Sequence, residues 1–362
     1  MKRIDIADVA DIATGAALLG AGGGGDPYIG RLMVEEAIRA FGPVELIDVD
    51  AVPDEALIVP TAMMGAPSVM VEKLPNGAEA EIGLEAIETA IGKRAHAIIA
   101  PEIGGLNAML PIVLAARRGL PLVDGDGMGR AFPELPMVTF NIFGQSISPL
   151  AISDELGNCV AVRTVDVESA ERLGRQIVVA MGAAAQICCY PMSGAEAKRS
   201  AVRGTVGLAW EIGRLLRVAR EQMCDPFEAL LTYLPTTDYY KHCRSLFDGR
   251  IVDLRREIAQ GFTVGTVEIE NTAQARISIQ FRNEYLVARQ DGKPVAIVPD
   301  LIAILDSETA TPITAEALKY GQRVRVIGIS APPILRSEPA LRVVGPQAFG
   351  FTDPFQPIEE MA

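Results

Sequence analysis

The first 130 residues alternate between segments with a helical apolar stripe and short segments that are mostly apolar and lack polar alternation. The mostly apolar segments cover residues 57–62, 97–100 and 120–123, with helical patterns at 82–91 and 106–118 between them. Strands without polar alternation are typical of a sheet covered on both faces, and parallel strands need a crossover between them. The pattern therefore predicts an N-terminal α/β layer with a mostly parallel sheet.

After about residue 135 the pattern changes, and the chain is expected to form a second domain of α+β type, rich in helix and then in β-structure. We place the domains at residues 1–165 and 166–362, and expect the tail 341–362 to pack back on the first domain. Predicted strands lie at 137–143, 146–153, 159–165, 264–269, 275–281, 284–289, 296–305 and 323–329, and predicted helices at 168–184, 195–222 and 226–234.

The composition of the chain argues against some classes of binding partner. The 46 Asp and Glu residues outnumber the 33 Lys and Arg residues, which argues against a nucleic-acid backbone as ligand. No apolar run approaches the length of about 20 residues that spans a membrane. Five cysteines without a C-x-x-C pair indicate reduced thiols, so we expect a cytoplasmic protein that assembles as a homo-oligomer and binds a small molecule.

A run of four glycines at residues 22–25 follows a predicted helix, and Asp26-Pro27 then opens another helix that extends to about residue 41. The bare amides of Gly23, Gly24 and Gly25, together with Asp26 at the helix start, are candidates for substrate binding. The run is neither a dinucleotide fingerprint nor a P-loop, so no nucleotide cofactor is expected. The alternative is a tight turn between two helices.

Two further loops follow predicted strands, where ligands bind in open α/β sheets. In the first, Glu102 is a candidate base or metal ligand and Asn107 an orienting amide that contacts substrate, although Glu102 as a helix cap is the alternative. In the second, Asp124 and Asp126 are candidate catalytic carboxylates, and Arg130 is a candidate for holding a substrate carboxylate. The alternative for this loop is a solvated turn with a structural Asp–Arg pair.

Glu102, Asp124 and Asp126 together could hold a divalent metal ion, so we expect the glycine loop and both strand-end loops to converge on one pocket. With only two histidines, His96 and His242, a His-rich zinc site is excluded.

His242 lies in a polar, aromatic stretch and is a candidate for substrate binding, with an exposed surface loop as the alternative. The polar run at residues 280–285 could line a cleft between the domains.

Several segments resemble one known family. They are LGAGGGGDP at 19–27, PEIGGLN at 101–107, PLVDGDGMGRAFPEL at 121–135, GTVEIEN at 265–271, EYLVAR at 284–289, PDLI at 299–302 and VVGPQAFG at 343–350. Together they are similar to the S-methyl thiohydantoin desulfurase family, which is associated with hydantoinase and oxoprolinase genes. The family pattern has Asn-Glu-Asn before Leu-Val-Ala-Arg, whereas here the third position is Tyr285.

The resemblance implies a two-domain fold and hydrolysis of an S-methyl thiohydantoin to a hydantoin and methanethiol. Our expectation is thus a hydrolase of a small cyclic amide-like substrate that uses a carboxylate- or metal-activated water. The alternative is a non-catalytic accessory or binding subunit of a hydantoinase- or oxoprolinase-type partner. An exposed apolar stripe of Leu215, Val218 and Met223 on the helix at 204–222 would favour that alternative.

Overall fold

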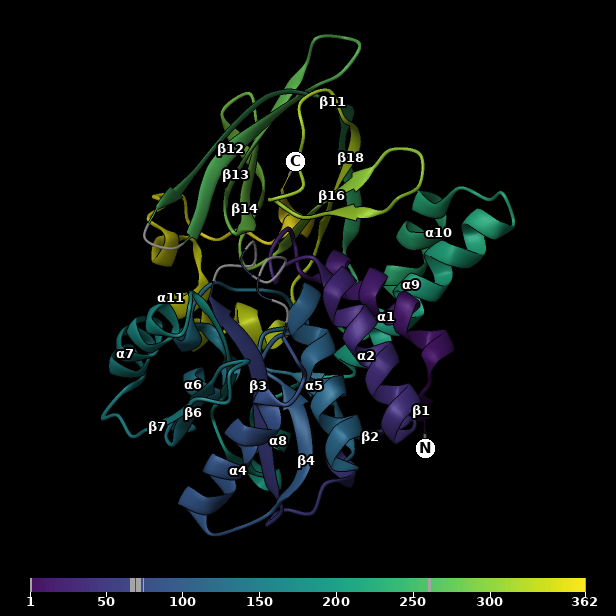
Figure 1. Ribbon diagram of the computed structural model, residues 1–362. Helices are drawn as coiled ribbons and strands as arrows, with labels where there is room; N and C mark the ends of the chain where they lie inside the picture. The colour runs from purple at the N-terminus through teal and green to yellow at the C-terminus, as the bar shows by residue number, and fades with distance from the viewer. Residues whose placement is uncertain (1, 66–68, 70–72, 74, 260–261, 362) are drawn as a thin grey trace.

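The computed structural model describes residues 2–65, 69, 73, 75–259 and 262–361. In this part of the chain the strands form two sheets, one in each half of the molecule (Figure 1). The first sheet has the order β1 (Lys2–Ile4), β2 (Val44–Asp48), β5 (Leu122–Asp126), β4 (Ala95–Ala100), β3 (Leu57–Gly65), β8 (Ala184–Cys188), β6 (Leu150–Ser153) and β7 (Cys159–Val162). Two short strands join it, β10 (Val202–Arg203) beside β5 and β9 (Met192–Ser193) beside β3.

The centre of the first sheet is parallel, as the apolar segments predict. Strands β2, β5, β4 and β3 pair in parallel, while the flanking strands pair antiparallel. All nine residues of β3 except the last are buried, which is the reason for its unbroken apolar sequence. Parallel pairing brings the carboxyl ends of β3, β4 and β5 to one edge of the sheet, and the loops that follow them therefore meet.

Helices that pack against the sheet are α4 (Glu79–Ile91), α5 (Gly105–Arg118), α7 (Val167–Ala180), α8 (Gly194–Ser200) and α9 (Thr205–Glu221). Outside α5 and α9 lie α1 (Ile6–Leu19), α2 (Pro27–Phe41) and α10 (Pro226–Tyr233). Helix α2 begins as predicted, with Asp26 as the N-cap and Pro27 in its first turn. Helices α1 and α9 touch backbone to backbone, because a Cβ on Gly15 would lie 1.9 Å from the Ala209 carbonyl oxygen. Glycine at this crossing thus allows the close packing of two helices that lie nearly two hundred residues apart in the chain.

Three predicted elements differ from the structure. The segment 137–143, expected as a strand, is a 3₁₀ turn followed by the short helix α6 (Thr139–Ile142). The single helix expected at 195–222 is interrupted by β10, whose pairing with β5 and the left-handed Gly204 separate α8 from α9. The strand expected at 296–305 is divided at Val298-Pro299, where the chain passes from one strand of the second sheet to another.

The second sheet is antiparallel throughout and lies above the first in Figure 1. Its order is β15 (Lys293–Ile297), β14 (Glu284–Gln290), β13 (Arg276–Arg282), β12 (Phe262–Glu270), β11 (Cys243–Ala259), β18 (Arg323–Ile329), β16 (Leu301–Asp306) and β17 (Pro312–Ile313). The expected fold class, an α/β layer followed by a helix-plus-β region, is confirmed.

Strands on both sides of residue 165 share the first sheet, so the sheets themselves divide the chain between Arg203 and Cys243. The end of the chain, with helix α11 (Glu338–Val344), runs back along both halves. Phe349 stacks on Phe132 with 6.4 Å between ring centroids, while Asp353 pairs with Arg289 of β14.

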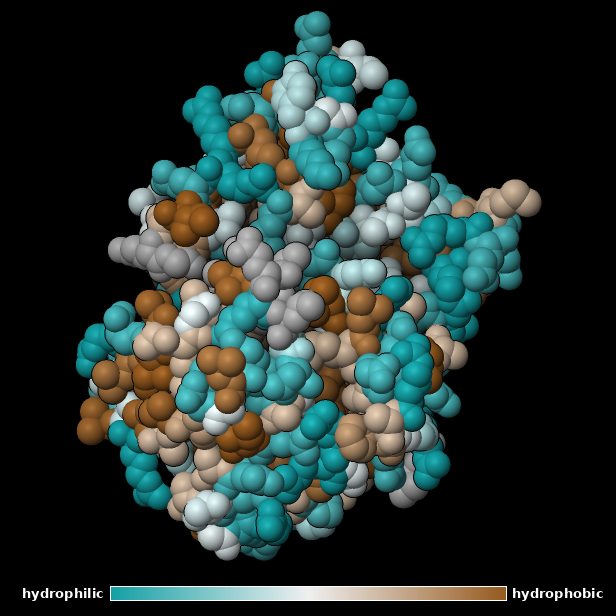
Figure 2. Space-filling model, viewed as in Figure 1, coloured by the Kyte–Doolittle hydropathy of each residue, from teal (hydrophilic) through white to brown (hydrophobic). Residues whose placement is uncertain are grey.

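The surface in Figure 2 shows small hydrophobic patches scattered among hydrophilic side chains. Within the described residues, no helix has the length and apolar character needed to cross a membrane.

Candidate functional site

A cavity of about 100 Å³ lies between the two sheets, beside the carboxyl ends of β3 and β4. Because one ordered water needs only about 10–15 Å³ of such space, the cavity has room for a small ring compound. Its polar lining comes from both halves of the chain: Glu102, Asn107, Glu134, Glu171, Arg175, Asn283 and Glu284. Its apolar lining includes Met63, Met64, Met128, Phe132, Leu135, Ile187, Cys189 and Phe262.

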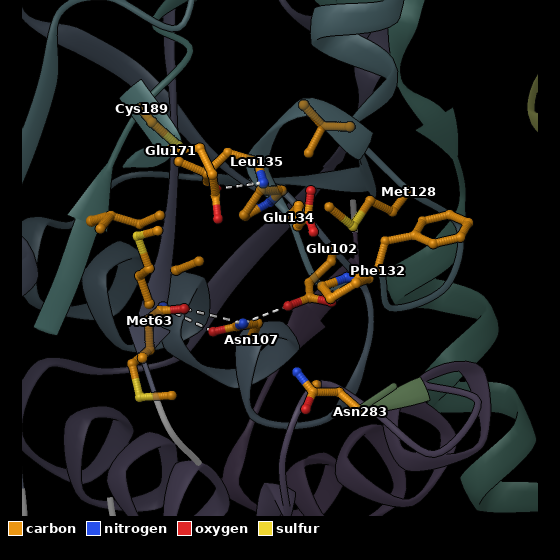
Figure 3. Close-up of a pocket in the computed structure, with 18 of the residues that line it drawn as sticks. Met63, Glu102, Asn107, Met128, Phe132, Glu134, Leu135, Glu171, Cys189 and Asn283 are labelled. Carbon is orange, nitrogen blue, oxygen red and sulfur yellow. Dashed lines mark hydrogen bonds between the residues drawn. The ribbon is translucent and has the colours of Figure 1, made fainter. Parts of the chain in front are cut away.

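Glu102 is the central carboxyl of this cavity (Figure 3). Only 8% of the residue is exposed, and its Oε1 accepts a hydrogen bond from Asn107 Nδ2 at 2.5 Å, while the Phe132 amide also favours the charged form. Its Oε2 has no hydrogen-bond partner among the described residues. Burial raises the pKa of Glu102 to about 8, since the charged form loses its hydration.

Asn107 holds this carboxyl in place. Its Oδ1 accepts a hydrogen bond of 2.8 Å from the Met63 amide, which leaves the Nδ2 group directed at Glu102 (Figure 3). Asn107 comes from the first turn of α5 and Met63 from β3, so two rigid elements determine the orientation of Glu102. The Glu102 carboxyl is therefore an oriented group rather than a helix cap, and the helix N-cap position is occupied by Gly104.

The glycine run is explained by backbone contact with the Glu102 loop. The Leu106 amide donates to the Gly24 carbonyl oxygen at 2.9 Å, and a Cβ on Gly24 would lie 2.5 Å from the Gly104 carbonyl carbon and oxygen. A Cβ on Gly105 would lie 2.1 Å from the Gly25 carbonyl oxygen. The loops meet as expected, but of the glycine-loop candidates only Gly24 lines the cavity.

The remaining residues of that loop have other partners. Gly23 lies against the Glu284 side chain, and Asp26 caps α2 by accepting a hydrogen bond of 2.8 Å from the Tyr28 amide. Asp26 lines a separate cavity beside α1. Of the glycine amides that we expected to be bare, that of Gly23 donates to the Gly20 carbonyl oxygen at 2.9 Å.

Asp126 and Asp124 accept hydrogen bonds from backbone amides and do not line the cavity. Asp126 is fully buried, and its Oδ2 accepts from the amides of Ile103, Met128 and Gly129 at 3.0, 2.9 and 2.7 Å. Burial raises its pKa to about 7. Asp124 Oδ1 accepts from the Gly207 amide at 2.9 Å, near the start of α9.

The expected metal site is not formed by these carboxylates. Among the residues that the structure describes, no three His, Cys, Asp or Glu side chains are grouped to hold a metal ion. Glu102, Asp124 and Asp126 lie on neighbouring loops, but each is directed at a different set of amide donors. Each carboxylate is held by its own donors, and the three do not form a shared set of ligands.

Arg130 does not bind a substrate carboxylate in the way we expected. It is fully buried and donates to the carbonyl oxygens of Ala131, Tyr285, Pro299 and Asp300, at 3.1, 3.1, 3.2 and 2.9 Å in that order. Burial lowers its pKa to about 10, so the side chain stays charged near neutral pH. Arg130 therefore joins the loop after β5 to the second sheet.

His242 is also outside the cavity lining. Its side chain is 57% exposed, and its Nε2 lies 4.0 Å from Glu359 Oε1 near the end of the chain. The expectation of a substrate-binding histidine is wrong for this cavity, and the surface-loop alternative describes its position.

Glu284 is a carboxyl of the cavity that the sequence did not single out. It is 2% exposed, begins β14 and lines the cavity from the second sheet. Its Oε2, like that of Glu102, has no hydrogen-bond partner among the described residues. Burial and the nearby Glu102 raise the pKa of Glu284 well above its ordinary value, against the lowering effect of Arg130. In the sequence, the feature that pointed to Glu284 was the polar run at residues 280–285, which we expected to line a cleft between the domains.

Charged side chains from both halves form the rim. Glu134 pairs with Arg282 at 2.7 Å across the two halves, and Glu171 pairs with Arg175 on α7. The guanidinium groups of Arg282 and Arg175 lie 4.0 and 4.5 Å from the ring centroid of Phe262. These residues also escaped sequence reasoning, because pairs between distant segments leave no local pattern.

Two family models together match nearly the whole chain. The model described as "S-Me-THD-like, N-terminal domain" matches residues 7–164, and "S-Me-THD-like, C-terminal domain" matches residues 165–358. A crystal structure of a protein from Chromobacterium violaceum has a similar fold, with a TM-score of 0.84 and 24% sequence identity over 99% of this chain and 100% of that one. A comparison with curated proteins finds no significant match.

Proposed function

The chain belongs to the S-Me-THD-like family, and from that premise we propose that it is a hydrolase acting in the cavity between its two sheets. The proposed substrate is a small cyclic amide-like compound, an S-methyl thiohydantoin, which yields a hydantoin and methanethiol. The observation that carries this proposal is the Glu102 carboxyl, buried, oriented by Asn107, and left with one unpartnered oxygen at the cavity.

A general base works best when its pKa lies near the working pH. With a pKa of about 8, Glu102 is ionised in part of the molecules near neutral pH and is a strong proton acceptor when ionised. Its unpartnered Oε2 is the atom free to accept a hydrogen bond from a water in the cavity. This combination supports a role for Glu102 in activating water.

In an S-methyl thiohydantoin, the ring carbon that carries the methylthio group is doubly bonded to a ring nitrogen. Glu102 accepts a proton from water while the water oxygen forms a bond to that carbon, and the ring nitrogen takes up a proton. The C–S bond then breaks as the carbonyl forms, and the methylthio group leaves with a proton as methanethiol. One water is consumed, and its two hydrogens end on the ring nitrogen and on sulfur.

The apolar lining of the cavity suits the leaving group. Met63, Met64, Met128 and Cys189 contribute thioether and thiol groups to this lining. Sulfur and methyl groups are readily accommodated by such flexible, polarisable side chains. Burial raises the pKa of the Cys189 thiol well above its ordinary range, so this cysteine is a neutral wall residue.

The test is a thiol-release assay with S-methyl thiohydantoins that differ in the substituent on ring carbon five. The purified full chain is expected to release methanethiol, and Glu102→Gln to lower kcat by about 10²–10⁴-fold, the usual contribution of a general base. Glu79→Gln is the matched control, because Glu79 is equally buried with one unpartnered oxygen but lies outside this cavity. Absence of thiol release by the wild-type chain, or equal rates for both variants, would contradict the proposal.

The alternative of a non-catalytic subunit depended on an exposed apolar stripe. Leu215 and Val218 are half-buried, and Met223, beyond the end of α9, is 93% exposed. The three residues therefore do not present the continuous face that would favour an accessory role.

A further inference from the structure

We propose that Glu284 is a second catalytic carboxyl, which shares one proton with Glu102 across the cavity. The catalytic part of this inference rests on the proposed function, whereas the shared proton does not. Glu102 follows β4 of the first sheet and Glu284 begins β14 of the second, so the pair exists only when the two halves are packed together.

The two carboxyls are similarly buried, and each has one oxygen without a hydrogen-bond partner among the described residues. Both line the cavity, both are more than nine-tenths buried, and the oxygen without a partner is Oε2 in each. Two ionised carboxylates in one desolvated site repel each other, and unpaired buried oxygens are costly. A single proton held between them, directly or through a water, gives one oxygen a donor and removes one of the two charges.

The surrounding charges compensate one carboxylate rather than two. Arg130 is the fully buried cation whose charge acts on Glu284, while the acids Asp126 and Glu316 add negative potential at Glu102 and Glu284. At the rim, Arg175 and Arg282 are already paired with Glu171 and Glu134. The balance therefore favours one negative charge on the pair.

The hydrogen-bond donors indicate where the proton resides. Glu102 accepts a hydrogen bond from Asn107, and Asn107 and the Phe132 amide both favour its ionised form. For Glu284 the described part of the chain supplies one backbone donor, its own amide. When the pair holds one proton, Glu102 is thus the ionised base and Glu284 the protonated acid, and both line the cavity.

This assignment completes the reaction and returns both groups to their starting forms. Glu102 takes a proton from water as the oxygen bonds to the ring carbon, and Glu284 gives its proton to the ring nitrogen. Glu284 then takes the proton of the new hydroxyl as the carbonyl forms. The C–S bond breaks, and Glu102 returns its proton to the departing sulfur.

The proton sharing is tested without substrate, by NMR pH titration of protein labelled at the glutamate carboxyl carbons. Wild type is expected to show two separated steps for the pair, and Glu102→Gln and Glu284→Gln each a single step between them. Glu79→Gln should keep both wild-type steps. The inference is overturned if the single-variant curves add up to the wild-type curve, because the carboxyls then titrate independently.

The catalytic role is tested by the pH dependence of kcat. An acid–base pair gives a bell-shaped profile, and Glu284→Gln should lose the alkaline limb and about 10²–10⁴-fold in kcat. A Glu284→Gln enzyme with wild-type kcat and an unchanged alkaline limb would overturn this role and leave the proposed function intact. If wild type releases no thiol, the proposed function fails, while the titration still decides whether the proton is shared.

Should Glu284→Gln not fold, Gly23→Ala provides a second route. A Cβ on Gly23 would lie 2.1 Å from Glu284 Oε1, and the backbone at Gly23 is not in the left-handed region. The added methyl group must therefore displace the Glu284 carboxyl. The two titration steps are expected to move closer together, and unchanged steps would contradict the inference.

Discussion

Burial raises the pKa of two neighbouring carboxyls, Glu102 in the cavity and Asp126 beside it. Both are buried, but they have different roles in the structure. Asp126 directs one oxygen at three amides and so holds loops together. Each acid has one oxygen without a partner among the described residues, but only Glu102 lines the cavity. The direction of the hydrogen bonds, rather than the residue type, separates the structural acid from the candidate catalytic one.

This difference predicts how stability depends on pH. The folded pKa of Glu102 is raised from 4.5 to about 8, so the folded state binds the proton more tightly than the unfolded state between these values. The free energy of unfolding therefore falls as pH rises through that window. Glu102→Gln should reduce the fall, with little effect on Tm at the acid end and a Tm above wild type at the alkaline end.

Thermal melts of both proteins across the window measure the effect, and the difference between them removes the contribution of other groups, including Asp126. A Glu102→Gln curve parallel to that of wild type would show that Glu102 titrates at its ordinary pKa.

Among the secondary-structure elements, the glycine loop and the loop before α5 depend on each other. Gly24 has a φ of 75°, and a Cβ there would meet the Gly104 backbone at 2.5 Å. Neither the left-handed conformation nor the contact with backbone can be relieved by moving a side chain. The apposition of these two loops is therefore available only to glycine, and it places Gly24 and Glu102 in one cavity.

Gly24→Ala is expected to destabilise the chain by about 2 kcal/mol or more, and to lower activity together with stability. Urea unfolding measures the loss. Gly92→Ala is the matched control, since Gly92 also has a positive φ, 76°, but has nothing within 4 Å of an added Cβ. A Gly24→Ala loss no larger than that of Gly92→Ala would mean that the loops are not in contact.

In the whole molecule, buried hydrogen bonds from Arg130 join the two halves around the cavity. Arg130 extends from the loop after β5 to three carbonyl oxygens of the second half, those of Tyr285, Pro299 and Asp300. Its planar fork suits several acceptors in fixed directions, which a lysine ammonium does not reproduce. Asp300 is held in turn by Arg336, so the chain end reinforces the same junction.

Arg130→Lys is therefore expected to lower the free energy of unfolding by about 3 kcal/mol, because buried carbonyl oxygens lose their donors. Urea unfolding of the full chain is the measurement. Arg255→Lys is the control, since that side chain is 84% exposed and its pair with Asp253 contributes about 1 kcal/mol or less. Similar losses for both variants would refute the junction role of Arg130.

Local patterns in the sequence determined much of the architecture. The apolar strands, the start of α2 at Asp26-Pro27, and the meeting of the glycine loop with the Glu102 loop follow from periodicity and turn chemistry. These features depend on residues that are near one another in the chain or on the general geometry of parallel sheets.

The tertiary structure alone decided which side chains face the cavity. Glu102 and Glu284 are 182 positions apart, and no local pattern indicates that β14 returns beside the end of β4. Likewise Asp124, Asp126, Arg130 and His242 have the chemistry of site residues, but nearby amides, carbonyl oxygens or solvent determine what they bind. A side chain's composition limits its chemistry, whereas its partners, which packing brings from distant segments, decide whether that chemistry is available.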